Sequence, residues 1–148
     1  MRSPSAAPRS PLKAVLVGSL TDLGGSLGAG QILMIGYGAV LASDGMAVAE
    51  IEQAMRQIDP GSGIALIGNV VGTLCSWLGG YVCARLAPAP ELKWAGIVAA
   101  ISGAAGLALG ADYPLPLTVL LSLISVAAVM LGGWMGAKRN AEQTPAAP

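Results

Sequence analysis

The sequence contains few charged side chains and no histidine. Charged residues make up 11% of its 148 residues, against roughly 25% in an ordinary soluble domain. Apolar residues make up 54%, so the chain has too little charge to cover a soluble surface, and a lipid bilayer is its expected solvent. The absence of histidine excludes imidazole metal ligands and any Ser–His or Cys–His nucleophilic pair.

Other absences narrow the functional classes further. The formal net charge is zero, which argues against a nucleic-acid partner, because phosphates demand a basic face. Cys75 and Cys83 lie about 12 Å apart on a helix, too far for a disulfide, so we expect packing residues. The glycines of "GSLGAG" lie inside an apolar run rather than after a strand, which excludes a nucleotide loop. We therefore expect no enzyme, no cofactor and no metal site.

Four long apolar runs are present, and each is long enough to cross a membrane as a helix, which takes about 20 residues. They span residues 14–42, 63–84, 94–111 and 115–137. The first contains 29 residues and extends about 43 Å as a helix, so we expect it to tilt, or to bend at Gly36 and Gly38. Its length and its interruption by Asp22 disfavour a cleaved signal peptide. The pattern predicts an all-α bundle of four transmembrane helices.

The segments outside these runs are polar or short. Residues 1–12 and 140–148 are rich in Pro, Ala and polar residues, and we predict disordered tails flanking a membrane domain at 13–139. The connection 44–61 places Val48, Ile51, Met55 and Ile58 on one helical face. We predict a short amphipathic helix there, lying along the outer interface or capping the bundle. Docking of a partner is the alternative.

Basic residues set the expected orientation. Seven of the eight basic residues flank one set of helix ends, and only Arg56 lies on the other side. The seven are Arg2, Arg9, Lys13, Arg85, Lys93, Lys138 and Arg139. By the positive-inside rule, both termini are predicted to be cytoplasmic.

Two similar phrases end the second and fourth runs, "LGGYVCAR" at 78–85 and "LGGWMGAKR" at 131–139. The runs before them also begin alike, with "LKAV" at 12–15 and "LKWAG" at 92–96. Each half of the chain therefore reads as a helical hairpin, which predicts two tandem parallel repeats related by an axis along the membrane normal. The alternative is convergence, because Gly, Trp and Arg are common at such interfaces.

The stretch "GGYVCARLA" at 79–87 resembles a helix end found in small bacterial inner-membrane proteins of unknown function. The resemblance covers under a tenth of the chain. It implies a bacterial four-helix membrane protein and no particular activity.

Small residues recur along all four runs, as tight packing between membrane helices requires, since lipid gives helices no hydrophobic reason to associate. The predicted packing glycines are Gly68, Gly72, Gly79, Gly80, Gly132, Gly133 and Gly136. A pore lined by these stripes is the alternative.

Asp22 is the one ionisable carboxyl deep inside a run. A charge at the bilayer centre costs at least about 2.5–3.5 kcal/mol, and no basic residue lies within another run to offset it. We expect Asp22 to face the bundle interior near Ser76, Ser102, Ser122 or Ser125. Gln31 and Asn69 are predicted to pair nearer the outer face. Asp22, Ser76, Ser102 and Ser125 form a candidate proton or cation site, with a structural hydrogen-bonded carboxyl as the alternative.

These observations favour an inner-membrane accessory or structural component, packing with itself as a homo-oligomer or within a larger membrane complex. The alternative is an oligomeric transporter or channel subunit that uses Asp22. The lipid bilayer is the expected partner in either case.

Overall fold

The computed structural model describes residues 10–110 and 113–143, and every regular element in these ranges is helical. The elements are α1 (Pro11–Ser19), the π-helix η1 (Leu20–Gly24), α2 (Gly25–Ser43), α3 (Val48–Arg56), α4 (Gly63–Leu86), α5 (Glu91–Leu109) and α6 (Leu115–Gln143). Because α1, η1 and α2 run on as one helix, four helices are long and apolar enough to cross a membrane. The predicted all-α, four-helix membrane architecture is confirmed.

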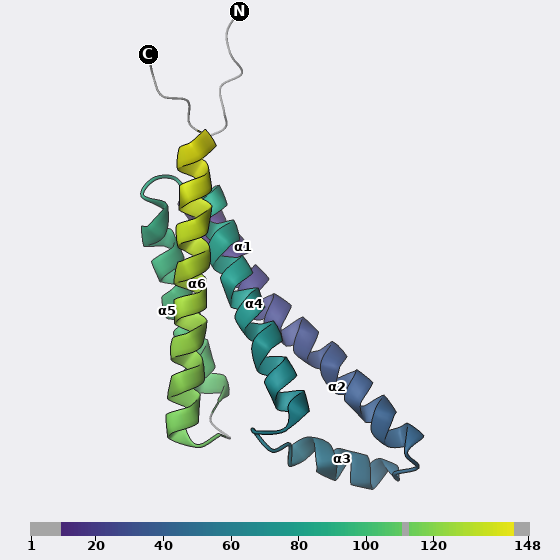
Figure 1. Ribbon diagram of the computed structural model, residues 1–148. Helices are drawn as coiled ribbons and strands as arrows, with labels where there is room; N and C mark the ends of the chain where they lie inside the picture. Colours follow the sequence, from purple (N-terminus) through teal and green to yellow (C-terminus); the bar gives the residue numbers. More distant parts are fainter. Residues whose placement is uncertain (1–9, 111–112, 144–148) are drawn as a thin grey trace, which may run out of the picture.

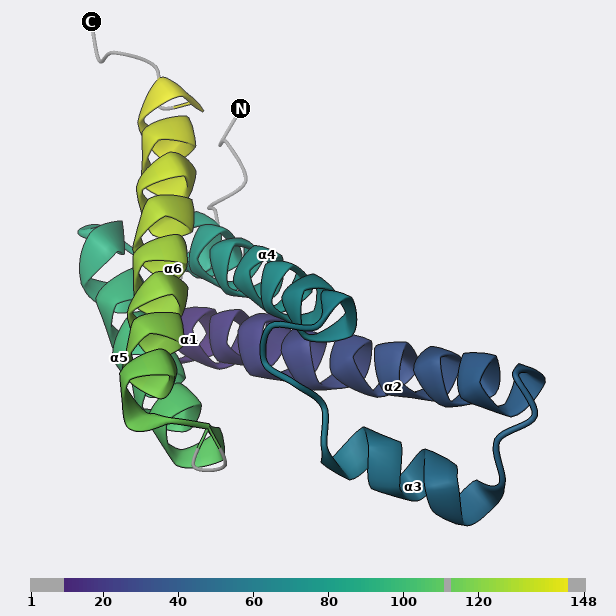
Figure 2. The same cartoon turned by 60° about the horizontal axis from the view of Figure 1, so that its bottom comes forward.

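The helices form two arms that meet near the chain ends and diverge away from them (Figure 1). One arm pairs α4 with the long first helix, and the other pairs α5 with α6. The start of α1 and the end of α6 lie at the same end of the molecule, where α4 crosses α6 (Figure 1). At the opposite end, α3 runs between the end of α2 and the start of α4 (Figure 2). The predicted short helix in the connection 44–61 is therefore present.

Both tails were predicted too long. Ser10 caps α1 by accepting a hydrogen bond from the Lys13 amide at 3.4 Å, so residues 11 and 12 are helical. At the other end, α6 continues to Gln143 because Asn140 is buried and bonded. Its amide nitrogen donates to the Ala84 carbonyl at 2.9 Å, and its oxygen accepts from Arg85 Nη1 at 3.0 Å. The rest of the predicted tails, at 1–9 and 144–148, lies outside the described residues.

Glycines bring the backbones of α4 and α6 into direct contact. A Cβ atom at Gly80 would overlap the carbonyl group of Val129, and one at Gly132 would overlap the carbonyl group of Trp77. Gly136 fits in the same way, with the Tyr81 carbonyl oxygen 2.7 Å from its Cβ position. Close approach at glycine is how membrane helices gain packing contacts that lipid does not provide.

Each Gly-Gly phrase has a second glycine, Gly79 beside Gly80 and Gly133 beside Gly132. This second glycine packs on the first helix of its own hairpin. A Cβ atom at Gly79 would lie 2.7 Å from the Gly18 carbonyl oxygen, and one at Gly133 would lie 2.5 Å from the Cβ atom of Ala95. The facing glycines, Gly80 and Gly132, are 52 positions apart, although the phrase repeats at 53. The two environments are therefore related but offset by one residue, and the tandem repeat stays a prediction.

One expected packing glycine, Gly72, is wrong, and the irregular turn of the first helix lies away from Gly36 and Gly38. The helix departs from α-helical geometry at Leu20–Gly24, whereas α2 is continuous through both glycines, and the expected tilt stays a prediction. Gly38 rather gives α3 a place to pack, with Met55 Sδ 3.6 Å from its Cβ position. Gly72 meets no atom within 4 Å of its Cβ position, because it faces a cavity rather than a helix. Gly68 makes ordinary contact with Leu33.

Candidate functional site

Asp22 lies in the π-helical turn and is 2% exposed. Its Oδ1 accepts a hydrogen bond from Ser76 Oγ on α4 at 2.7 Å. Its Oδ2 is in hydrogen-bond contact with the Ser102 hydroxyl on α5. The carboxyl therefore joins three helices through two hydroxyls, and its turn belongs to a type of helix irregularity that is frequent at functional sites.

Ser102 makes a second contact. Its hydroxyl donates to the carbonyl oxygen of Val98, one turn earlier in α5, at 2.9 Å. Ser76 and Ser102 are 3% and 4% exposed, so the whole group is shielded from the surface. We refer to Asp22, Ser76 and Ser102 as the Asp22 cluster.

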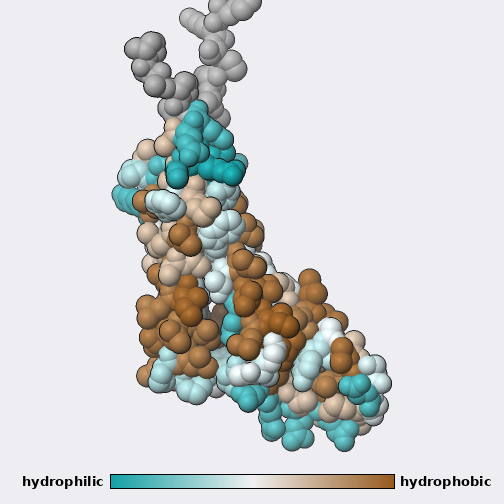
Figure 3. Space-filling view, viewed as in Figure 1, coloured by the Kyte–Doolittle hydropathy of each residue, from teal (hydrophilic) through white to brown (hydrophobic). Residues whose placement is uncertain are grey.

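A cavity of about 180 Å³ begins at the Asp22 cluster. Its other polar lining residues are Ser26 from α2 and Ser125 from α6. The remaining wall is apolar or glycine and comprises Leu23, Leu27, Gly72, Ala105, Gly106 and Leu109. Along each helix, most of the other lining residues lie nearer to α3 than the Asp22 cluster does. The cavity therefore extends from the cluster toward the α3 end of the molecule, away from the chain ends. The space-filling view has a hollow between the two apolar arms in that half of the molecule (Figure 3).

Toward the chain ends the bundle is closed. Ala14, Cys83 and Val98 are fully buried there and pack together just beyond Asp22. A Cβ atom at Gly18 would lie 2.7 Å from Cys83 Cβ, so the helices have no space between them. The Asp22 cluster therefore sits where tight packing gives way to the hollow.

No basic side chain accompanies Asp22 within the described part of the spans. The lysines and arginines of α1, α4, α5 and α6 all lie near the ends of their helices. Among the described ranges, no group of three acidic, cysteine or histidine residues is placed to hold a metal ion. Among the residues that the structure describes, the hydroxyls of Ser76 and Ser102 are the side-chain groups hydrogen-bonded to the carboxyl.

The structure brings together most of the residues predicted around Asp22. Ser76 and Ser102 contact it and Ser125 lines the same cavity. Ser122 faces Gly106, and its buried Oγ has no hydrogen-bond partner within the part of the chain described. Whether the cluster binds an ion stays a prediction.

The predicted pair of Gln31 and Asn69 is not formed: both residues are exposed, and no hydrogen bond joins them in the described ranges. Near this level, Leu33 on α2 packs against Gly68 on α4. Gln31, two positions earlier, points about 200° away around the helix. Counting depth along each helix gives the level of a residue but not its direction.

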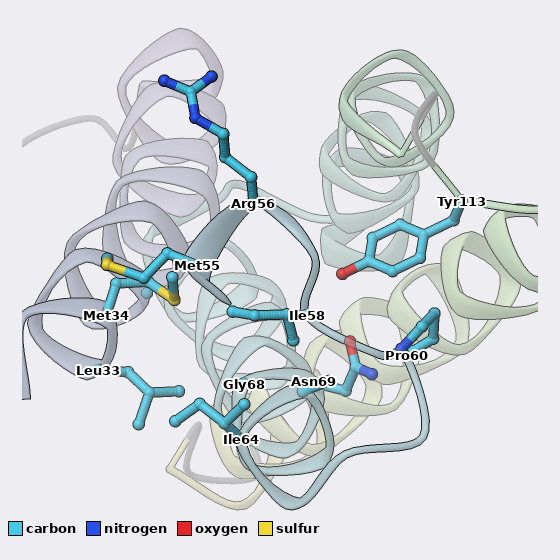
Figure 4. A pocket seen from close by; sticks show the side chains of 12 residues that line it. Leu33, Met34, Met55, Arg56, Ile58, Pro60, Ile64, Gly68, Asn69 and Tyr113 are labelled. Carbon is cyan, nitrogen blue, oxygen red and sulfur yellow. The ribbon is translucent and has the colours of Figure 1, made fainter. Parts of the chain in front are cut away.

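A second cavity, of about 440 Å³, lies under α3 and was not predicted. Leu33, Met34, Met55, Ile58 and Ile64 give it largely apolar walls. The Tyr113 hydroxyl points toward Ile58 and Asn69, whereas the Arg56 side chain extends away from the cavity (Figure 4). The amphipathic pattern of residues 48–58 indicated an apolar face but not the cavity beneath it.

A polar cluster at the chain-end side of the bundle was also not predicted. Arg85 Nη1, which donates to Asn140 Oδ1, also donates to Gln143 Oε1 at 3.0 Å. The Asn140 side-chain nitrogen donates to Glu91 Oε1 at 3.3 Å. These contacts fasten α4, α5 and α6 together. The only sequence signal was the position of Asn140 directly after the basic pair Lys138–Arg139.

Comparisons with protein-family models, with curated proteins and with solved structures find no match to this chain.

Proposed function

We propose that this protein is a multi-pass membrane protein whose Asp22 cluster binds and releases a proton or small cation, as a subunit of an oligomeric transporter or channel. One observation carries the proposal: a buried carboxyl, with no cationic partner among residues 10–110 and 113–143, accepts hydrogen bonds from hydroxyls of two other helices at the inner end of a cavity. Ionisable groups inside membranes are costly and are retained mainly where ions or protons move.

The setting of the site follows from the distribution of charge. Basic residues flank the closed end of the bundle and acidic residues flank the end beneath α3. By the positive-inside rule, the closed end faces the cytoplasm and the cavity opens toward the outer face. The resemblance of "GGYVCARLA" to bacterial proteins favours the bacterial inner membrane.

An oligomer belongs to this proposal because one copy does not enclose the space between its two arms, which pack tightly against each other only in the half near the chain ends. Gly18, Gly79 and Gly80 close the cytoplasmic half with backbone contacts. In addition, α2 has no buried residue, and Ile32 and Ile35 on it are 73% and 70% exposed. A neighbouring copy packed on α2 would cover these side chains and enclose the space between the arms.

The test is proton flux into vesicles. The purified chain is reconstituted into liposomes containing a pH-sensitive dye, and a potassium diffusion potential drives proton entry. We expect flux with the wild-type chain and with Asp44→Asn, which removes an exposed carboxylate at the end of α2. Asp22→Asn should abolish it. Equal flux through Asp22→Asn and the wild-type chain would refute the proposal.

An accessory structural role is the second candidate, and the same hydrogen bonds favour it. Asp22 joins the first helix to α4 and α5, so the carboxyl is able to serve only as a fastener. In that case neither chain carries protons, and Asp22→Leu, which removes every hydrogen bond, disrupts assembly whereas Asp22→Asn does not. Co-purification from the native membrane would then identify the complex that the protein joins.

A further inference from the structure

We propose that the cavity under α3 binds a neutral single-chain amphiphile, a molecule with one apolar chain and an uncharged head group that forms hydrogen bonds. The cavity has a volume of about 440 Å³, in the lower half of the range of roughly 300–1,000 Å³ that is typical of small-molecule sites. It shares no lining residue with the cavity at the Asp22 cluster. Occupancy of this site is therefore a property separate from proton or cation transport at Asp22.

The lining of the cavity is divided into an apolar end and a polar end. Figure 4 shows four apolar side chains on one side and the Asn69 amide and Tyr113 hydroxyl on the other. The apolar four are partly buried, whereas Asn69 and Tyr113 are exposed, so the polar end opens to the surface and the apolar end lies deeper. The four are Leu33, Met34, Met55 and Ile64. This division matches a ligand that is itself apolar at one end and polar at the other.

The two polar groups are available to a ligand. Within residues 10–110 and 113–143, neither the Asn69 side-chain amide nor the Tyr113 hydroxyl has a hydrogen-bond partner. The Asn69 contact that is present uses its backbone carbonyl, which accepts from Thr73 Oγ1 at 2.8 Å. An amide and a phenolic hydroxyl can each donate and accept. Together they fit the hydroxyl or carbonyl oxygen of an uncharged head group.

The charges around the cavity favour an uncharged ligand. Of the described residues that line it, Arg56 is the one charged residue, and its side chain extends away from the cavity (Figure 4). Asp59, in the loop beside the lining residue Pro60, already accepts a hydrogen bond from the Gly61 amide at 2.8 Å. A charged head group would therefore lose water without gaining a counter-ion, which is costly.

The roof of the cavity explains why a flexible apolar chain suits it. Ile51 and Met55 hold α3 on α2, lying 3.9 and 3.6 Å from the Cβ position of Gly38. Met55 also lines the cavity, together with Met34 from α2. Methionine is unbranched and adapts to irregular apolar surfaces, so these walls can close around a single chain. An occupant would add apolar contacts to the inner face of α3.

Photolabelling with a defined probe tests the proposal. Hexadecanol with a diazirine in its chain is added to the full-length chain in phosphatidylcholine liposomes, and mass spectrometry locates the labelled residues. We expect saturable labelling around Met34, Met55 and Ile64 that unlabelled hexadecanol displaces. Labelling that never saturates and spreads over the exposed face of α2, at Ile32 and Ile35, would show contact with bulk membrane only and would overturn the proposal.

Two competitors test the head group at equal mole fractions in the membrane. Hexadecane has the same chain without a hydroxyl, and hexadecyl sulfate has a charged head. Each should displace the probe less effectively than hexadecanol, by about two- to tenfold for the hydrogen bonds that hexadecane cannot form. Equal displacement by hexadecane would remove the polar end from the site. Stronger displacement by hexadecyl sulfate would show that Arg56 turns inward to an anion, and either result contradicts the proposal.

A cavity-filling substitution on α2 tests the location of the site. Gly30 lines the cavity and has no atom within 4 Å of its Cβ position, so Gly30→Leu fills the space without displacing other residues. The matched control is Gly36→Leu on the same helix, where the Cβ position is equally open but does not line the cavity. Gly30→Leu should abolish the saturable labelling and Gly36→Leu should retain it. Full labelling of Gly30→Leu at wild-type helicity would refute the site.

A second pair of variants tests the polar end without changing the packing of a helix. Tyr113→Phe removes the hydroxyl that points into the cavity, and Tyr37→Phe removes one from a tyrosine that does not line it. Tyr113→Phe should weaken displacement by hexadecanol about two- to tenfold, the effect of one hydrogen bond, and leave displacement by hexadecane unchanged. Tyr37→Phe should change neither. An unchanged response of Tyr113→Phe to hexadecanol would contradict the proposed contact.

Discussion

The crossing of α4 and α6 gives the sharpest energetic prediction, because two alanine substitutions on one helix should have opposite effects. At Gly80, an added methyl group would overlap the backbone carbonyl of Val129, which has no side-chain freedom to move aside. The two helices must separate and lose contacts along the crossing. Overpacking of this kind typically costs about 1–3 kcal/mol, and the upper part of that range applies where backbone is the obstacle.

Gly72→Ala is the matched control, because nothing lies within 4 Å of its Cβ position. There alanine gains roughly 0.4–1 kcal/mol, since glycine loses more conformational entropy on folding. Both variants are unfolded reversibly by increasing the fraction of denaturing detergent in mixed micelles, with helicity and Trp fluorescence as probes. The two free energies of unfolding should differ by about 2–4 kcal/mol. Equal stabilities would show that α4 and α6 do not touch at Gly80.

Three further predictions follow from other contacts. Asp22→Asn should change the free energy of unfolding by less than about 1 kcal/mol, the scale of interhelical hydrogen bonds in membranes. The reason is that the asparagine amide can donate to one serine hydroxyl and accept from the other. A larger loss in the same detergent titration would contradict the hydrogen-bond pattern. Asn140→Leu should destabilise the chain by about 1–3 kcal/mol, since the buried Ala84 carbonyl loses its side-chain donor; an unchanged midpoint would mean that the end of α6 does not dock. Single cysteines are placed at Glu52 or at Ala89 in a chain without its native cysteines. The cysteine at position 52 should react with an impermeant maleimide from outside the cell, and the one at position 89 only from inside. Labelling of position 89 from outside would reverse the proposed orientation.

The fold was largely predictable because a bilayer imposes simple rules on sequence. The length of each apolar run set the number of spans, and the amphipathic spacing of Val48, Ile51 and Met55 indicated α3. The exact helix ends were less predictable, because they depend on contacts distant in sequence. Composition suggested a tail at Asn140, whereas the Ala84 carbonyl, 56 positions away, keeps that residue helical.

The candidate site was predictable in membership but not in geometry. Cost alone implied that Asp22 must face hydroxyls, and counting depth along the helices selected Ser76 and Ser102. Depth does not give direction, so the expected pairing of Gln31 with Asn69 is wrong. The π-helical turn at Leu20–Gly24, which packs against α4, had no sequence signal that distinguished it from the glycine pairs elsewhere.

In the proposed transport path, the Asp22 cluster is reached from the outer face through the cavity between the arms. Substituted-cysteine accessibility tests this access, with both native cysteines replaced by alanine and a cationic, impermeant methanethiosulfonate added outside intact cells. Ser125→Cys, which lines the cavity, should be modified, whereas Leu123→Cys, at a position 60% exposed on the lipid-facing side of α6, should not. Modification of Ser125→Cys only from the cytoplasmic side, or of neither position from outside, would contradict the account.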